Sequence, residues 1–167
     1  SGGKTLHLGV LMANKGQVIA MDTEAWKLKE LKRRAKRNGI FIIQPKPIDS
    51  TKVIKRQKES ADRLLLDVPC SGLGVLRRNP DAKWKLQPEF LEKIRGEQAN
   101  IISNYSKMLK KGGKMVYATC SILPSENQAQ VQRFLEKHGD DFALEEERSI
   151  SPEEGYDGFY MARLVRR

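Results

Sequence analysis

The chain has 167 residues, a length that suits one domain with a substantial buried core. Its 31 Lys and Arg residues outnumber its 21 Asp and Glu residues, and the formal net charge of +10 favours a polyanionic partner such as nucleic acid. No apolar run approaches the roughly 18 residues of a membrane span, and the polar opening residues show no signal-peptide pattern. We therefore expect no membrane partner, and no obligate protein partner is evident.

The cysteine and histidine content argues against a disulfide framework and against a metal site. Cys70 and Cys120 are the two cysteines, and His7 and His138 lie far from both in the sequence. Two separated thiols indicate a reducing, cytoplasmic setting. Since no pair of ligands has metal-site spacing, we expect no metal.

Short apolar runs alternate with amphipathic stretches along the chain, as an α/β sheet requires. Thr23 predicts the start of a helix that runs to about Asn38, with Gly39 after its end. Pro88 predicts the start of a longer helix, to about Lys110. The apolar runs predict buried parallel strands at residues 17–22, 40–44, 63–68 and 114–119.

The two ends of the chain complete the predicted fold. Ser125 and Gln128 form a capping-box pattern before a third helix, and residues 158–165 alternate as a last strand, antiparallel at the sheet edge. A glycine run at residues 2–3 should follow a strand, and no such strand precedes it. The prediction is a doubly wound, Rossmann-like α/β sheet truncated at its first strand, with residues 1–167 forming one N-terminally incomplete domain.

The segment Gly2-Gly3-Lys4-Thr5 has the composition of a loop that binds a ligand at a helix N-terminus. Asp22 follows at the carboxyl end of the next strand, where acidic side chains meet the ribose of nucleotide-like cofactors. An alternative is a phosphate-binding NTPase loop, because residues 3–5 match its end and residues 64–67 mimic the strand that holds magnesium. A second alternative is a non-catalytic basic RNA-binding module.

Each cysteine lies directly after a predicted strand and beside a small hydroxyl residue. Asp67 and Cys70 follow one strand in the segment DVPCSG, and Cys120 follows the next in YATCS. A single cysteine in an apolar strand is usually a small core residue. Two such placements at the carboxyl edge of one sheet indicate a site in the crevice above that edge.

These segments resemble the RNA 5-methylcytosine methyltransferases of the Nol/Nop/Sun group, including the bacterial Sun/Fmu (RsmB-like) type. The resemblance extends from residue 2 to residue 164, with Val68 in place of the usual Ala and Tyr160 in place of the second Phe of the closing motif. The segments that carry it are GGKT, DVPCSGLGVLRRNPDAKW, YATCSILPSENQAQV and DGFYMARL.

The resemblance implies an S-adenosylmethionine-dependent enzyme that methylates carbon 5 of a cytosine in structured RNA, with ribosomal RNA favoured over transfer RNA. Spacing alone leaves open which cysteine attacks, because the Pro-Cys pair also resembles the DNA cytosine methyltransferase motif. The RNA family implies Cys120 as the nucleophile, Cys70 in product release and Asp67 at the base. The implied cofactor contacts are Ser1, Gly2, Gly3, Lys4, Asp22, Asp49 and Asp67, and the candidate RNA contacts are Arg77, Arg78 and Lys83.

Overall fold

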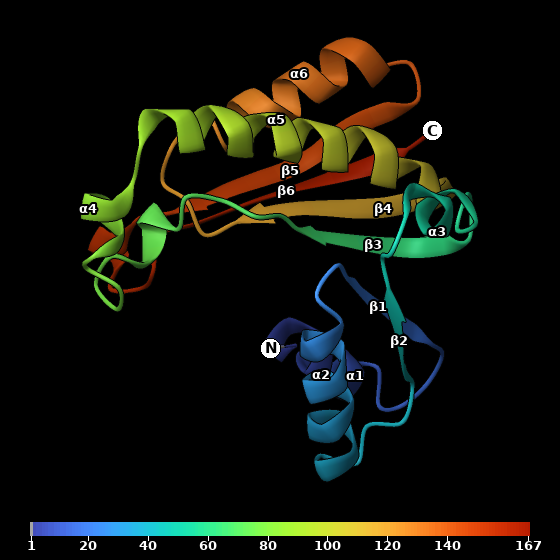
Figure 1. Cartoon of the computed structure of the whole chain (residues 1–167). Helices are drawn as coiled ribbons and strands as arrows, with labels where there is room; N and C mark the ends of the chain where they lie inside the picture. The colour runs from blue at the N-terminus through green and yellow to red at the C-terminus, as the bar shows by residue number, and fades with distance from the viewer. Residues whose placement is uncertain (1) are drawn as a thin grey trace. The chain divides into compact units, whose positions relative to one another are not determined.

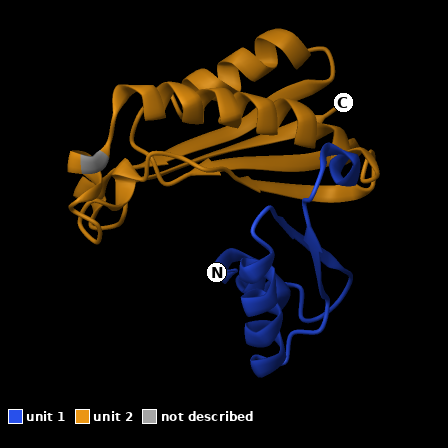
Figure 2. Ribbon diagram, viewed as in Figure 1, with its two compact units in different colours: residues 1–54 blue, residues 55–167 orange. Residues whose placement is uncertain are grey.

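The computed structural model describes residues 2–167, with the side chain of Lys85 outside that description. The chain divides into two compact units, residues 1–54 and residues 55–167, which Figure 2 shows in different colours. Each unit has its own sheet and is described by itself. Within residues 2–167, no helix combines the length and the apolar character needed to cross a membrane.

The first unit is a two-stranded parallel sheet with its helices (Figure 1). Its crossover helix allows the two strands to run parallel, and a small apolar cluster lies between this helix and the sheet. Ala20, Leu28 and Leu31 form that cluster, with Leu6 and Ile43 packed against it. The elements are α1 (Gly3–Leu11), β1 (Val18–Asp22), α2 (Ala25–Arg37), β2 (Ile43–Pro47) and α3 (Thr51–Lys55), which reaches the boundary between the units.

The predicted helix of the first unit is confirmed, but its cap is not Thr23. The N-cap of α2 is Glu24, whose backbone N–H donates a 2.8 Å hydrogen bond to Oδ1 of Asp22. The Asp22 carboxylate therefore forms the turn into the helix, a role that the sequence had suggested for the threonine hydroxyl. The C-terminal prediction holds, because Gly39 follows the helix with a φ of +64°.

The second unit is a four-stranded mixed sheet in the order β3-β4-β6-β5. β3 is parallel to β4, whereas β6 is antiparallel to both β4 and β5. Figure 1 shows α5 and α6 on one face of this sheet. The elements are β3 (Ala61–Asp67), η1 (Leu73–Val75), α4 (Ala82–Lys85), α5 (Pro88–Tyr105), η2 (Ser106–Met108), β4 (Leu109–Thr119), α6 (Gln128–His138), β5 (Phe142–Ile150), η3 (Pro152–Glu154) and β6 (Phe159–Arg166).

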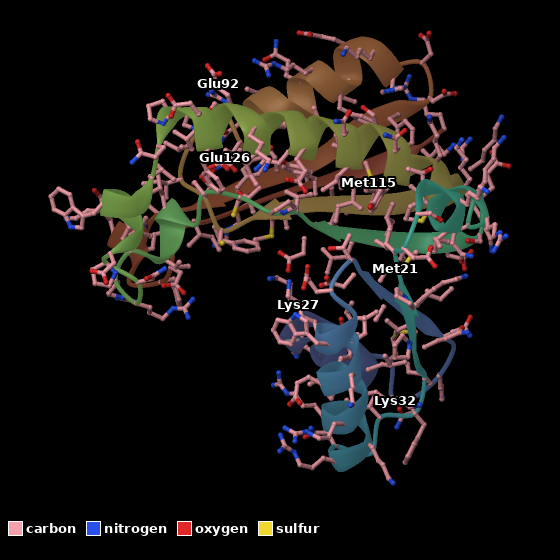
Figure 3. All side chains as sticks on the ribbon, in the orientation of Figure 1. Met21, Lys27, Lys32, Glu92, Met115 and Glu126 are labelled. Atoms are coloured by element: carbon pink, nitrogen blue, oxygen red, sulfur yellow. The ribbon has the colours of Figure 1, made fainter. Side chains whose placement is uncertain are left out.

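The core of the second unit lies between the sheet and these two helices. Alternate residues of β4 and β6 point into it, because side chains of a strand alternate between the two faces. Met115 and Tyr117 of β4 are fully buried, and Figure 3 shows Met115 between the sheet and α5. Ile102 of α5 and Phe134 of α6 close the cluster from above. This packing fixes the strand ends that carry the cysteines.

The connection between α5 and β4 differs from the sequence prediction. The helix ends at Tyr105, short of Lys110, and a 3-10 turn leads into a strand that begins at Leu109. The pairing of β3 with β4 shifts between Ala61 and Arg63, where Gly112 has a φ of +73°. Gly112 and Gly113 therefore lie at an irregularity within β4. They do not terminate α5.

Three further expectations are corrected. α6 begins at Gln128 with Asn127 as its N-cap, so the capping box at Ser125 does not form. β5 was not predicted at all, because its FALEEERSI sequence is mostly exposed and acidic. As expected, β6 is antiparallel, but β5 occupies the sheet edge and β6 lies between β4 and β5.

The strands predicted for one sheet belong to two sheets. β1 pairs with β2, and β3 pairs with β4, whereas no pairing joins β1 to β3 among residues 2–167. One edge of each of these strands thus has no strand partner within the described chain. The α/β class is confirmed, with parallel pairs in both units and an antiparallel β5–β6 pair.

Candidate active site

The two cysteines lie side by side in the second unit, at the carboxyl ends of neighbouring parallel strands. Cys120 directly follows β4, and Cys70 lies three residues after the end of β3. Their sulfur atoms are 3.3 Å apart, within hydrogen-bonding distance, and both residues are thiols of intermediate exposure. Two thiols that share a proton at a half-buried sheet edge form a candidate nucleophilic centre.

The electrostatics of the pair distinguish its members. The pKa of the Cys70 thiol is raised, first by its hydrogen bond with Cys120, then by burial and by the charge of the Cys120 thiolate. The raised pKa favours the protonated form of Cys70 beside the sulfur of Cys120. Arg78 is coupled to the same centre, because its pKa is raised mainly by Asp157 and further by Cys120.

Asp67 is the last residue of β3, and it pairs in register with Ala118, two residues before Cys120. Its side chain is exposed at the same edge of the sheet. The structure thus brings together three residues that the sequence placed at one crevice. An exposed carboxylate at the strand end that precedes the thiols can accept hydrogen bonds from a ligand at this edge.

Sequence reasoning missed Glu126, which is fully buried with an exposed fraction of 0%. Its carboxylate accepts hydrogen bonds from the Ser71 and Ser121 hydroxyls and from the Ser71 backbone N–H. Gln98 of α5 adds a fourth, at 3.0 Å. The sequence offered no signal for this burial, because Glu126 lies between Ser125 and Asn127 in a polar stretch that resembled a helix cap.

Two glycines join the site to the C-terminal segment. The N–H of Gly74 donates to the carbonyl of Cys120 at 2.9 Å, and the N–H of Gly158 donates to the carbonyl of Gly74 at 2.7 Å. A Cβ at Gly74 would lie 2.0 Å from the Gly158 oxygen and 2.7 Å from that of Cys120. The close backbone approach therefore requires glycine at position 74.

The predicted RNA contacts lie on exposed segments after Cys70, but two of them have partners within the chain. Arg77 donates to the Gly155 carbonyl at 3.0 Å, and Arg78 forms an ion pair with Asp157 at 2.7 Å. Lys83 lies over the ring of Trp84, 4.8 Å from its centroid. Trp84 itself is 77% exposed, so its ring is not part of the core.

The predicted cofactor residues other than Asp67 belong to the first unit. Gly2, with a φ of +77°, is the N-cap of α1, followed by Gly3 and Lys4; Ser1 lies outside the described residues. Asp22 ends β1, and its Oδ1 also lies 3.9 Å from Nζ of Lys27. Asp49 follows β2 and accepts a 3.0 Å hydrogen bond from Ser50. Because β1 and β2 are parallel, both carboxylates lie at the same edge.

In the part of the chain that the structure describes, no group of three or more His, Cys, Asp or Glu side chains is arranged to hold a metal ion. The chemistry that these residues can perform is nucleophilic. A thiolate at Cys120 with a thiol beside it can form a covalent bond to an electrophilic carbon and later release it.

Comparison with known proteins identifies the family. A family model described as 16S rRNA methyltransferase RsmB/F matches residues 1–165. The chain belongs to this family. The match leaves the phosphate-loop NTPase interpretation without support. The Gly-Lys-Thr sequence at residues 3–5, which suggested that interpretation, lies within the matched region.

Individual RsmB/F relatives agree. The chain is 41% identical over 140 residues to the probable ribosomal RNA small subunit methyltransferase B of Synechocystis sp., covering 83% of this chain and 31% of that protein. It is 39% identical over 174 residues to ribosomal RNA small subunit methyltransferase B of Yersinia enterocolitica, covering 99% and 40%. The chain thus spans 31% to 40% of the length of these curated relatives.

A solved structure supports the fold of the RsmB/F chain. NSun6 from Pyrococcus horikoshii, determined with SFG, superimposes with a TM-score of 0.87 at 29% identity. The match covers 99% of this chain and 45% of that protein. Both units of the chain therefore have counterparts in that structure.

Proposed function

We propose that the protein transfers a methyl group from S-adenosylmethionine to carbon 5 of a cytosine in RNA, with ribosomal RNA favoured over transfer RNA. The observation that carries the proposal is the pair of thiols, Cys70 and Cys120, 3.3 Å apart at one sheet edge. Membership of the RsmB/F family supports it. Two adjacent thiols suit a reaction in which a covalent bond to sulfur forms and then breaks.

In the proposed reaction the Cys120 thiolate adds to carbon 6 of the cytosine. Carbon 5 is a poor nucleophile in the aromatic ring, and this addition converts it into the nucleophilic end of an enamine. S-adenosylmethionine, when bound, supplies the electrophilic methyl group that carbon 5 accepts. Loss of the carbon 5 proton to solvent and departure of the Cys120 sulfur as a thiolate restore the ring, so the protein ends the cycle as it began and one proton is released.

Cys70 assists the departure of Cys120. The leaving sulfur gains negative charge as its bond to carbon 6 breaks, and a thiol 3.3 Å away can donate a hydrogen bond to it. The raised pKa of Cys70, caused first by its contact with Cys120, keeps the required proton in place. The geometry therefore supports nucleophile and release roles for Cys120 and Cys70 respectively.

Asp67 binds the base during the addition. Its carboxylate is exposed beside the thiols, at the end of β3. A carboxylate at the N3 and amino edge of cytosine favours protonation at N3, and that protonation makes carbon 6 more electrophilic. This role needs a base removed from its stack, as in other enzymes that modify bases.

The described residues of the first unit fit an adenosine-containing cofactor. Gly2 lets the backbone N–H groups at the start of α1 approach a ligand closely. Asp22 and Asp49 offer carboxylate oxygens at one edge, as acceptors for ribose hydroxyls and for the adenine amino group respectively. We propose that the cofactor contacts within this chain include Ser1, Gly2, Gly3, Lys4, Asp22, Asp49 and Asp67.

The basic segment after Cys70 contacts the RNA backbone. Arg77, Arg78 and Lys83 are exposed, and the overall charge of +10 favours binding to phosphates. The intrachain partners of the arginines shape this segment, and their guanidinium groups retain further donors for phosphate oxygens. The exposed Trp84 ring beside Lys83 offers a stacking surface for an unpaired base.

We further propose that residues 1–167 belong to one catalytic domain with a single doubly wound sheet. The parallel pairs β1–β2 and β3–β4 support this proposal, because a doubly wound sheet is built from such pairs.

A methyl-transfer assay tests the function. The protein that carries residues 1–167 is incubated with ribosomal RNA and a methyl-labelled donor, and 5-methylcytosine is quantified. Cys120→Ala should abolish transfer, whereas Ser125→Ala, in the same loop, should retain it. Undiminished transfer by Cys120→Ala would rule out the proposed nucleophile, and label on another atom would rule out the reaction.

A further inference from the structure

The carboxylate of Glu126 is saturated with hydrogen-bond donors. Oε1 accepts from the Ser71 backbone N–H at 2.8 Å and from Nε2 of Gln98 at 3.0 Å. Oε2 accepts from the Ser71 hydroxyl at 2.5 Å and from the Ser121 hydroxyl. An ionised carboxylate offers about four acceptor positions, so every one of them is used.

The serine donors are the residues that directly follow the two cysteines. Ser71 follows Cys70, and Ser121 follows Cys120. The two hydroxyl oxygens lie 3.1 Å apart. Each hydroxyl has one proton, and when both protons go to the same Glu126 oxygen, the carboxylate determines the spacing of the two loops.

Glu126 is itself held rigidly. Its carbonyl accepts a 2.7 Å hydrogen bond from the buried Tyr117 hydroxyl, on the strand that leads to Cys120. The next residue, Asn127, contacts Oγ1 of Thr119 at 2.5 Å and the Ser121 carbonyl at 2.8 Å. Glu126 is therefore fixed to β4 at its backbone and bonded to both cysteine loops at its side chain.

A second connection links the carboxylate to the loop before Cys70. Gln98 of α5 is fully buried, and its Nε2 donates both to Glu126 and to the Pro69 carbonyl, the latter at 2.9 Å. Figure 3 shows Glu126 between α5 and the ends of the strands. The Pro-Cys segment is thus held at Pro69 as well as at Ser71.

We propose that Glu126 is a positioning residue that holds the sulfurs of Cys70 and Cys120 at their contact distance. The positioning is a property of the fold, while its use in methyl transfer rests on the proposed function. A carboxylate suits the task because all four neighbouring groups are donors. The NH2 group of a Gln side chain cannot accept: facing the Ser71 backbone N–H and Gln98 it would meet two donors, and facing the serines it would force both hydroxyls to turn and accept.

The equilibrium of the two thiols with glutathione measures their mutual placement directly. In this exchange, Cys70 and Cys120 are oxidised to a disulfide while one glutathione disulfide is reduced to two glutathione thiols, so atoms and electrons balance. The ratio of disulfide to dithiol reports how well the fold presents the sulfurs to each other. The disulfide-to-dithiol ratio of each folded variant is divided by the ratio measured for the same variant unfolded in urea. This normalisation removes any effect of the substitution on disulfide formation in the unfolded chain.

Glu126→Gln should lower this normalised ratio by roughly tenfold or more, since a displacement near 1 Å already costs about 100-fold in comparable intramolecular reactions. Glu92→Gln removes an exposed carboxylate from α5 and serves as the matched control, with an unchanged ratio. An unchanged ratio in folded Glu126→Gln would overturn the proposal. Should this variant fail to fold, Ser71→Ala combined with Ser121→Ala should lower the ratio, and a native ratio there would equally overturn it.

The RNA reaction separates this inference from the proposed function. If the positioning matters for catalysis, Glu126→Gln lowers kcat for methyl transfer by roughly tenfold and leaves KM for the methyl donor unchanged. A native protein that lacks methyl transfer, with a glutathione ratio that still depends on Glu126, would refute the function and retain the positioning. Native kcat in Glu126→Gln would refute the catalytic use of the positioning.

Discussion

Gly158 donates a 2.7 Å hydrogen bond from its backbone N–H to the carbonyl of Gly74, and the two backbones approach too closely for any side chain. The same Gly74 donates to the carbonyl of Cys120. The loop after Cys70, the loop at Cys120 and the segment before β6 therefore meet at one point. This backbone contact therefore links the DVPCSGLG segment, which contains Cys70, to the DGFY segment near the C-terminus.

Gly74→Ala should destabilise the fold by about 1–3 kcal/mol, because its Cβ would lie 2.0 Å from a backbone oxygen that cannot rotate away. Gly96→Ala is the matched control. No atom lies within 4 Å of its Cβ position in the exposed middle of α5, so we expect stabilisation of about 0.5–1 kcal/mol. Urea unfolding measures the free energy of unfolding of both variants. Equal values for Gly74→Ala and Gly96→Ala would contradict the claim that position 74 requires glycine.

Alkylation with iodoacetamide should modify Cys120 before Cys70. Only the thiolate reacts, and the raised pKa of Cys70 leaves less thiolate there at any given pH. The rate at Cys70 should therefore keep rising as the pH passes the ordinary thiol value of about 8.5. Mass spectrometry of the two peptides across a pH series provides the measurement.

Cys120→Ala provides the control for that experiment. The hydrogen bond with Cys120 is the largest cause of the raised Cys70 pKa, so its removal should lower that pKa toward the ordinary value. Cys70 should then react faster at neutral pH than in the native chain. If Cys70 is alkylated at the same rate in Cys120→Ala and in the native chain, the two thiols do not interact.

Lys83→Ala and Arg77→Ala should each weaken RNA binding uniformly across sequences. Loss of one phosphate contact to single-stranded RNA should reduce the slope of log affinity against log salt by about 0.7. Lys107→Ala, an exposed lysine in η2, is the control for loss of charge alone. Binding titrations at several salt concentrations give the slope for each variant. Equal slopes for all three variants would show that the segment after Cys70 has no special role in phosphate binding.

Sequence patterns located the strands that carry the site because each strand ends in a short apolar run that a Cys-containing segment follows. The runs before Asp67 and Cys120 are buried on at least one face, so their periodicity was readable. Parallel strands end at the same edge, and that rule placed Asp67, Cys70 and Cys120 together before any coordinates. The family resemblance then supplied the chemistry.

Other features depend on tertiary context that local patterns do not contain. Glu126 is surrounded by donors from three separate segments, so nothing near it in the sequence marks it as buried. β5 carries acidic residues that face solvent, and its strand conformation comes from pairing with β6. Glu24, not Thr23, is the N-cap of α2, because the Asp22 carboxylate accepts a hydrogen bond from the Glu24 backbone N–H.

The central claim assigns attack to Cys120 and release to Cys70, and trapping of a covalent adduct tests it most directly. Cys70→Ala protein is incubated with RNA and methyl donor, digested with nuclease and protease, and the nucleotide-bearing peptide is identified by mass spectrometry. The account predicts an accumulating adduct on the peptide that contains Cys120, diminished in Cys70→Ser, which restores a donor. An adduct on the Cys70 peptide of Cys120→Ala, with none in Cys70→Ala, would reverse the two roles.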